Sequence, residues 1–319
     1  MLTLHNLMEE FHDKKGEVIM RKVRILFVVS LLFLMAFTTS VYAANKTGVT
    51  YTALGDSIAF GTGGTNGIGY TDLFNAHLAK INGEGVFLEL AQDGVTSADL
   101  LGTLLDPIDM LLVQDAVSRS DFITISIGGN DLLGPFMQEL AMSVIPYYYN
   151  NEFGTFDLEG LLADLEAWHG DSANPDYAHF NAMFGNLSYN TFPSAIATFA
   201  SNWALIIGQI RLLNPLATIY VNTGYNPFVN IPLLQAWVDP YVQTVNAIIM
   251  NESLVQMYDY EIVDVYTAFK YYKNPKKLEL GDLSNLAEFA LNPDTVPVPL
   301  HPTDLGYKFI FNLHKDLLK

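Results

Sequence analysis

From residue 50 onward, short runs rich in β-branched residues alternate with longer segments of helical periodicity. Such alternation is typical of βα units, whose strands lie side by side in a parallel sheet. The third run, 121–127, is apolar enough to be a buried central strand. The predicted strands are 49–54, 86–91, 121–127, 218–223 and 260–265. The sequence therefore predicts an α/β domain, with any ligand site at the carboxyl ends of its strands.

Helical periodicity fills the connections between these strands. The segment 135–190 is an exception, because it is rich in aromatic residues and contains no strand that fits the sheet. A long insert after a central strand is typical of a cap or lid. The alternative is a helical subdomain whose aromatic residues fill a core of their own, and both can hold at once. The predicted helices are 70–81, 97–117, 194–213, 237–258 and 304–318, the last with Thr303 as its N-cap.

Composition excludes several classes of function. Half of the 319 residues are hydrophobic, so the chain can bury a sizeable core. The formal net charge of −18 would repel a phosphate backbone, so nucleic acid is not expected as a partner. The absence of cysteine excludes thiol catalysis, disulfides and zinc–thiolate sites. The histidines show no metal-ligand spacing, so neither a metal nor a cofactor is expected.

The N-terminal region has the pattern of a secretory signal. Positive residues at 21–24 precede an apolar run at 25–37, and Val-Tyr-Ala at 41–43 gives a small-residue cleavage pattern. An uncleaved membrane anchor is the alternative, but the apolar run is short for a span.

These features divide the chain into three parts. We expect a Sec-type signal peptide at 20–43 and a single mature domain at 44–319. Residues 1–19 do not fit a signal peptide, and Met20 stands directly before the positive residues of the signal. We therefore interpret Met20 as the true translation start and 1–19 as a leader assigned to the protein in error. This predicts a secreted bacterial protein with no membrane span after cleavage, and we expect it to be a monomer.

Polar and glycine-rich turns follow the first two predicted strands. The first strand ends in Leu54-Gly55-Asp56-Ser57, where the Ser57 hydroxyl would face the ligand edge of the sheet. A lone serine at a turn is most often only a cap or turn residue. After the second strand, Gly94 lies between strand and helix, where its N–H can point toward a ligand.

The third strand and the last helix add two more polar side chains at the same edge. The third strand runs into Gly-Gly-Asn-Asp at 128–131, which places the Asn130 amide where a developing oxyanion would need a donor. His301 stands just before the last predicted helix and is a candidate base. Alone, a histidine there is more often structural.

In order and context, Gly-Asp-Ser at 55–57, Gly94, Gly-Gly-Asn-Asp at 128–131 and His-Pro-x-x-x-Gly-Tyr at 301–307 resemble the SGNH (GDSL-type) hydrolase family. The likeness extends from about residue 50 to the C-terminus, apart from the insert. It implies a three-layer α/β/α sandwich of flavodoxin-like type around a five-stranded parallel sheet, which agrees with the strands predicted above.

The same resemblance implies roles for individual residues. Ser57 would attack an ester carbonyl and His301 would take its proton. The N–H groups of Ser57 and Gly94 and the side-chain amide of Asn130 would hold the oxyanion. Asp56 and Asp131, which flank these residues, are interpreted as turn and hydrogen-bond supports.

One position departs from the family pattern. Members usually carry an aspartate three residues before the histidine, where this chain has Val298. The acid that orients His301 is therefore unassigned, and three candidates stay open: Asp294, Asp304, or a backbone carbonyl near Val298 that would leave a Ser–His dyad.

Three functions fit the resemblance. A secreted carboxylesterase or lipase acting on small-molecule or lipid acyl esters is the first, and a carbohydrate O-acetyl esterase acting on acylated glycans is the second, since sugars stack on aromatic residues such as those of the insert. The third is a binding protein that kept the fold and lost turnover, which the missing aspartate allows and the four retained site residues oppose.

Overall fold

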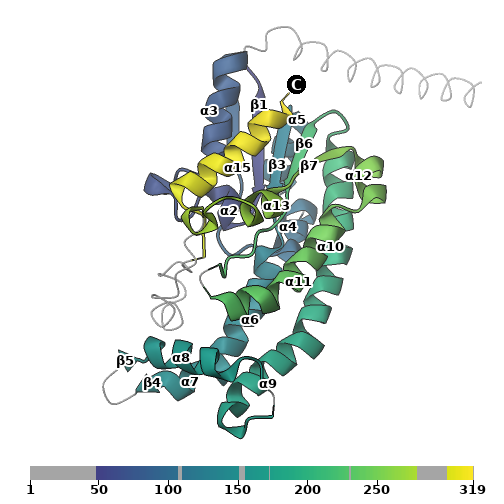
Figure 1. Ribbon diagram of the computed structural model, residues 1–319. Helices are drawn as coiled ribbons and strands as arrows, with labels where there is room; N and C mark the ends of the chain where they lie inside the picture. Colours follow the sequence, from purple (N-terminus) through teal and green to yellow (C-terminus); the bar gives the residue numbers. More distant parts are fainter. Residues whose placement is uncertain are drawn as a thin grey trace, which may run out of the picture. The chain divides into compact units, whose positions relative to one another are not determined.

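The apolar runs that alternate with helical segments form one central sheet of five parallel strands, in the order β2-β1-β3-β6-β7 (Figure 1). Each strand lies within two residues of its predicted bounds, and the third predicted strand is the central one. The predicted five-stranded parallel sheet is therefore confirmed. The bounds are β1 Thr50–Gly55, β2 Val86–Glu89, β3 Phe122–Ser126, β6 Thr218–Asn222 and β7 Tyr260–Val263.

The computed structural model describes residues 48–106, 110–150, 155–171, 173–229, 231–278 and 300–318. The leader and the signal peptide predicted at 1–19 and 20–43 lie outside these residues, as do Asp294 and Val298. Residues from Gly48 onward form one compact unit.

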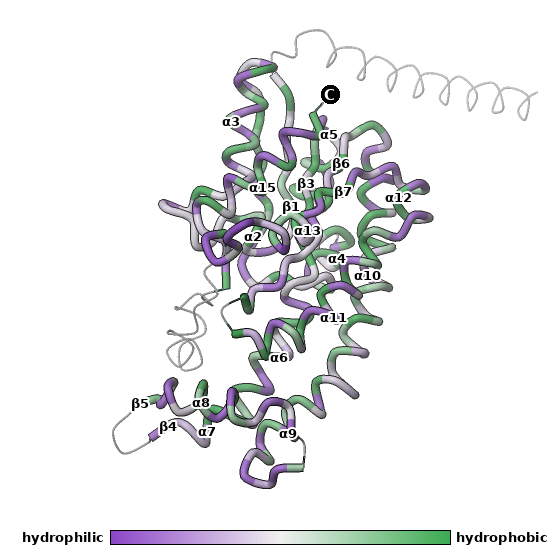
Figure 2. The backbone as a smooth tube through the Cα atoms, viewed as in Figure 1, coloured by the Kyte–Doolittle hydropathy of each residue, from purple (hydrophilic) through white to green (hydrophobic). Residues whose placement is uncertain are grey.

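The two faces of the sheet are covered by different helices, because successive side chains of a strand point to opposite faces. On one face, Tyr51 and Tyr220 pack with α3 (Tyr70–Asn82) and α15 (Asp304–Leu317). On the other, Ile123 belongs to a larger core with α4 (Ser97–Leu105), α5 (Met110–Arg119) and α10 (Phe192–Leu213). The result is the expected three-layer arrangement, with hydrophobic colour concentrated on the central strands and on parts of α10 (Figure 2).

Two helices that were predicted as continuous are each broken in two. The predicted helix 97–117 consists of α4 and α5, because Asp106 has an extended backbone and precedes a proline, which disfavours helical geometry. The predicted helix 237–258 consists of α11 (Pro232–Ile249) and α12 (Glu252–Tyr258). Here the Asn251 side chain accepts the N–H groups of Ser253 and Leu254 and so starts a new helix.

The connection from β3 to β6 is mainly helical. Among the described residues, its two short strands, β4 (Tyr149–Asn150) and β5 (Thr155–Phe156), pair only with each other and not with the main sheet. A π-helical turn at Leu187–Thr191 leads into α10. In the described part of this connection, the α-helices that precede α10 are α6 Gly129–Ser143, α7 Ile145–Tyr148, α8 Leu158–Trp168 and α9 Ala178–Asn186.

One helical stretch in the described part of the chain, Pro175–Leu213, is long and apolar enough to cross a membrane by length and composition. Its α10 portion places Phe199, Trp203 and Ile206 in the core, where all three are fully buried. Other apolar residues of the same helix, such as Leu205 and Leu212, are exposed.

Candidate active site

Ser57 stands on a tight turn at the carboxyl end of β1. It is the first residue of the short helix α2 (Ser57–Phe60), and the Asp56 carboxylate caps that helix by accepting the Ile58 N–H at 3.1 Å. Gly55 has φ +129°, and a Cβ there would lie 1.9 Å from the Ser126 carbonyl oxygen. Only glycine can therefore occupy the position before Asp56, and the sharp turn is built into the sequence.

His301 lies beside this serine although the two are 244 residues apart in the chain: its Nε2 is 2.8 Å from Ser57 Oγ. The histidine belongs to the loop just before α15, and Thr303 caps that helix by accepting the Gly306 N–H at 3.2 Å. Of the predicted site residues, Ser57 and His301 are thus in direct hydrogen-bond contact. A nucleophile and a base at this distance are the arrangement that activates a serine.

Gly94 and Asn130 come from the next two strand ends. Gly94 has φ +77° in the turn before α4, and Asn130 lies in the first turn of α6. The Asn130 Nδ2 donates to the Val95 carbonyl oxygen at 2.9 Å, so its amide lies one residue from Gly94 along that loop. Because an amide nitrogen carries two hydrogens, this bond orients the group and leaves a second donor.

A close contact fixes the start of α6. Gly128 has φ +108°, and a Cβ on it would lie 2.8 Å from a ring carbon of Phe199 and 3.1 Å from a methyl group of Val245. The turn that delivers Asn130 is therefore pressed against α10 and α11, and no side chain fits there.

Asp131 joins the two loops that carry Gly94 and Asn130. Its carboxylate accepts the Ser97 N–H at 3.0 Å and the Ser97 hydroxyl at 2.5 Å, and the Asn202 amide donates to the same hydroxyl at 3.0 Å. Asp131 and Ser97 are buried, and burial raises the pKa of the Asp131 carboxyl. This buried carboxylate ties the N-terminus of α4 to the first turn of α6.

The carboxyl of Asp56 is buried next to Ser57. Burial raises the pKa of this carboxyl to about 7. The hydrogen bonds that it accepts from the Ile58 N–H and the Ser126 hydroxyl have the opposite, smaller effect. Both Asp56 and Asp131 therefore act as acceptors for neighbouring backbone and hydroxyl groups, as expected for turn supports.

The third candidate acid has other partners. Asp304 Oδ1 accepts the Thr65 N–H and its Oδ2 accepts the Thr65 hydroxyl, both at 2.7 Å, and these bonds lower the Asp304 pKa. Both oxygens of this exposed carboxylate thus hold the turn at Thr65–Gly67. The other two candidates, Asp294 and the carbonyl near Val298, lie outside the described residues.

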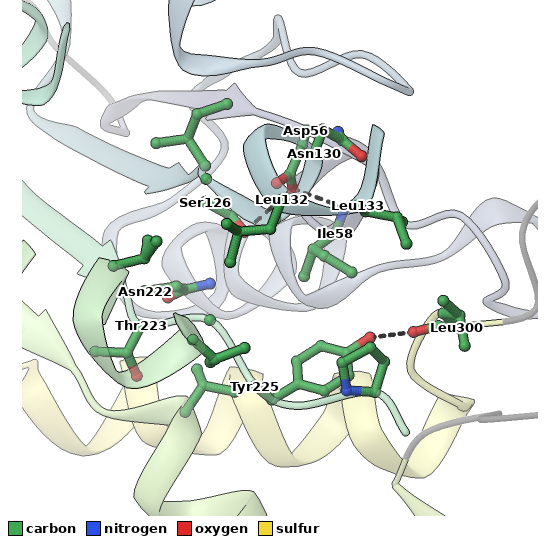
Figure 3. Close-up of a pocket in the computed structure, with 18 of the residues that line it drawn as sticks. Asp56, Ile58, Ser126, Asn130, Leu132, Leu133, Asn222, Thr223, Tyr225 and Leu300 are labelled. Carbon is green, nitrogen blue, oxygen red and sulfur yellow. Dashed lines mark hydrogen bonds between the residues drawn. The ribbon is translucent and has the colours of Figure 1, made fainter. Parts of the chain in front are cut away.

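A cavity opens at Ser57 and His301, and Figure 3 shows some of the residues that line it. Its polar groups include Asp56, Ser57, Asn130 and His301, whereas most of the wall is apolar. The apolar wall is built from α6, α10, α11 and neighbouring loops, with Leu132, Leu133, Phe136, Phe192, Phe228, Val238, Val242 and Val245.

The predicted insert is divided in its contacts. Phe136 lines the cavity, but among the described residues no lining residue comes from 137–191. Aromatic rings farther along pack on one another and on α11, as Trp168 stacks on Phe184 at 4.6 Å between ring centroids and Phe184 meets Trp237 edge-on at 4.5 Å. This packing fits the subdomain with a core of its own, and a role of the segment as a cap or lid stays a prediction.

Sequence reasoning missed Tyr225 and Asn246, which line the same cavity as His301. The Tyr225 hydroxyl donates to the Leu300 carbonyl oxygen at 2.6 Å, next to His301, and Asn246 bonds to Gly224. The only signal was Gly-Tyr-Asn-Pro at 224–227, directly after the fourth strand, where ligand-edge residues are expected.

The sequence model of the GDSL-like lipase/acylhydrolase family matches residues 53–309. No curated protein sequence matches the chain.

Solved structures show a similar fold. The lipase Lip_vut3 from a goat rumen metagenome has 19% identity and a TM-score of 0.51, with 84% of this chain and 96% of that chain covered. Phospholipase A1 from Streptomyces albidoflavus NA297 has 16% identity and a TM-score of 0.51, covering 84% and 99%. The extracellular lipase from Streptomyces rimosus has 17% identity and a TM-score of 0.50, covering 83% and 98%. At these identities the likeness concerns the fold.

Proposed function

Because the chain belongs to the GDSL-like lipase/acylhydrolase family and is an ester-hydrolysing enzyme, we propose that Ser57 is its nucleophile and His301 its general base. The observation that carries this assignment is the 2.8 Å contact between Ser57 Oγ and His301 Nε2, two residues that line the cavity. The alternative of a binding protein that has lost turnover is set aside, because the matched family is one of lipases and acylhydrolases.

The reaction follows from these two groups. Ser57 Oγ attacks the ester carbonyl carbon while its proton passes to His301 Nε2, and the C–O bond to the alcohol then breaks as that proton moves to the leaving oxygen. Water, deprotonated by the same Nε2, then attacks the carbonyl carbon of the acyl-enzyme. The bond from that carbon to Ser57 Oγ breaks as the proton on Nε2 moves to Oγ, which releases the acid and restores the serine. The negative oxygen of each tetrahedral intermediate is held by the N–H groups of Ser57 and Gly94 and by the Asn130 amide.

The cavity wall favours an acyl ester with a hydrocarbon chain. Its surface beyond the polar mouth comes from leucine, valine and phenylalanine side chains, and burying a methylene group there is worth about 0.8 kcal/mol. An acetyl group would leave most of that wall uncovered. We therefore propose a carboxylesterase or lipase activity on acyl chains longer than acetyl, in preference to carbohydrate O-acetyl esterase activity.

The test is a series of p-nitrophenyl esters from acetate to palmitate, assayed beside acetylated xylan. We expect kcat/KM to rise with chain length before it levels off where the cavity is filled. Highest activity on acetylated xylan would overturn the substrate assignment in favour of the acetyl esterase.

The nucleophile is tested separately. Ser57→Ala should abolish hydrolysis and labelling by a fluorophosphonate probe, while Ser118→Ala, at an exposed serine of α5, should behave as wild type. Labelling that persists in Ser57→Ala would place the nucleophile elsewhere.

We also propose that the protein is exported, on the strength of the signal-like pattern at 20–43. N-terminal sequencing of the protein from the culture medium should find a start at residue 44 or 45. A cell-retained protein that still carries residues 20–43 would refute export.

A further inference from the structure

The loop after β6 bonds to the loop that carries His301. The Tyr225 hydroxyl donates to the Leu300 carbonyl oxygen at 2.6 Å, and Figure 3 draws this bond as a dashed line. Leu300 directly precedes His301 and is buried, so the bond reaches the backbone at the base itself.

The position of Tyr225 is in turn fixed by α11. The Asn246 amide donates to the Gly224 carbonyl oxygen and accepts the Gly224 N–H, both at 2.8 Å. Asn246 is 4% exposed, so these two bonds satisfy a buried amide on both sides. The Tyr225 ring also packs on Phe269, with ring centroids 5.0 Å apart.

The geometry of the peptide bond makes the Leu300 carbonyl an effective place to hold the histidine. The carbonyl group of Leu300 and the N and Cα atoms of His301 lie in one rigid plane. Fixing the oxygen therefore restricts the direction in which the His301 Cα presents its side chain. A contact of 2.8 Å between Nε2 and Ser57 Oγ depends on that direction, because a tilt of the plane is amplified along the imidazole.

We propose that Tyr225, braced by Asn246, is a positioning residue for the general base His301. The inference rests on the proposed function, since it assigns a support to the base of that reaction. The hydroxyl of Tyr225 acts through the backbone at Leu300 and does not touch the reacting atoms.

A simpler role competes with this one, because Tyr225 also lines the cavity beside the apolar wall. A residue that only lines the cavity would affect binding of the acyl chain, and its effect on KM would grow with chain length. A positioning residue would lower kcat by the same factor for every chain length, because the base acts on the same ester group in each substrate.

The experiment compares Tyr225→Phe with wild type on esters from acetate to palmitate. This variant keeps the ring against Phe269 and removes only the hydroxyl. We expect kcat to fall about five- to tenfold at all chain lengths, the scale of one net hydrogen bond, with KM unchanged. The rate of fluorophosphonate labelling of Ser57 should fall by the same factor. The melting temperature should fall by only a few degrees, the scale of one lost hydrogen bond to the buried Leu300 carbonyl.

Tyr266→Phe is the matched control. It removes a hydroxyl that donates to Asp239 at 2.9 Å and does not line the cavity at Ser57, so its kinetics should equal those of wild type.

Asn246→Leu tests the brace. It should lower kcat by a comparable factor, and adding Tyr225→Phe to it should cost less than the two effects combined, since both act through one set of bonds. Melting curves establish that this variant is folded. If Asn246→Leu unfolds, the Tyr225→Phe kinetics alone decide the proposal.

A normal kcat in Tyr225→Phe, or an effect confined to KM and increasing with chain length, would overturn the proposal. Those results leave the proposed function standing as long as wild type is labelled at Ser57. A wild type without labelling or hydrolysis would refute the proposed function and this inference together.

Discussion

The buried carboxylate of Asp131 connects two turns of the site, and removing it tests how much they depend on it. Asp131→Ala would leave the Ser97 N–H and hydroxyl without their acceptor in a buried place. Each buried donor left unsatisfied costs about 1–3 kcal/mol, or about 2–6 kcal/mol for the pair. The raised pKa of Asp131 indicates that the carboxylate itself is destabilised by burial, and the substitution relieves that cost. We therefore expect a net loss of about 3 kcal/mol in the free energy of unfolding.

The activity should fall by a separate route. Ser97 is the first residue of α4, and the turn with Gly94 immediately precedes that helix. Once the tether is lost, this turn can shift relative to Asn130, and a displacement of about 1 Å can cost a factor of about 100 in rate. We expect kcat to fall by about 10- to 100-fold on every ester, with little change in KM.

Urea denaturation followed by circular dichroism gives the free energy of unfolding, and initial rates on a p-nitrophenyl ester give kcat. Asp115→Ala is the control, because Asp115 forms an exposed salt bridge with Arg119 on α5 and such bridges contribute about 0–1 kcal/mol. If Asp131→Ala is as stable as this control, the energetic argument is wrong. If it is destabilised but turns over normally below its unfolding transition, Asp131 supports the fold and not the oxyanion donors.

Three further outcomes follow from the site and its surroundings. Asn130→Ala should lower kcat by about 10²–10³ with little change in KM, as steady-state kinetics will measure, because an oxyanion donor acts mainly in the transition state. Asp304→Asn should keep kcat within about threefold of wild type, because its carboxylate bonds to Thr65; a loss near 10⁴ would instead make it the acid that orients His301. Burial raises the Glu89 pKa to about 7, so the folded protein keeps a proton that the unfolded chain has lost, and stability falls as pH rises from about 4.5 to 7. Glu89→Gln should flatten that decline and raise the free energy of unfolding at pH 8 by about 2 kcal/mol, as urea titrations will measure. If the free energy of unfolding of this variant varies with pH as in wild type, the prediction is wrong.

The strands could be predicted from the sequence because their signal is local. Runs such as 121–127 are apolar and β-branched over their whole length, and burial on both faces of a parallel sheet requires that composition. The helix breaks were missed for the opposite reason. Apolar periodicity continues through Asp106 and Asn251, and only the backbone geometry before a proline, or a side chain that caps the next helix, ends the first helix there.

The candidate site was predictable to the extent that parallel strands end at one edge. That rule, together with the family resemblance, singles out Ser57, Gly94, Asn130 and His301, and the structure brings the first and last of these into contact. The support of the His301 loop by Tyr225 was not predictable in the same way. It depends on how α11 packs beside the loop after β6, and no local pattern in the sequence encodes the angle between those elements.

Helix α11 both lines the cavity and carries Asn246, and this affects how chain-length preference can be engineered. Val242 and Val245 line the cavity, and Asn246 follows directly on the same helix. A substitution that enlarges or narrows the cavity from this side moves the helix that carries the brace, so selectivity and turnover change together. Leu133 and Phe136 line the cavity from α6, which carries no part of that brace. A substitution at Leu133 or Phe136 would leave the brace in place but would act on the helix that carries Asn130. The size of the cavity is therefore coupled to the proposed base through α11 and to the proposed oxyanion donor through α6.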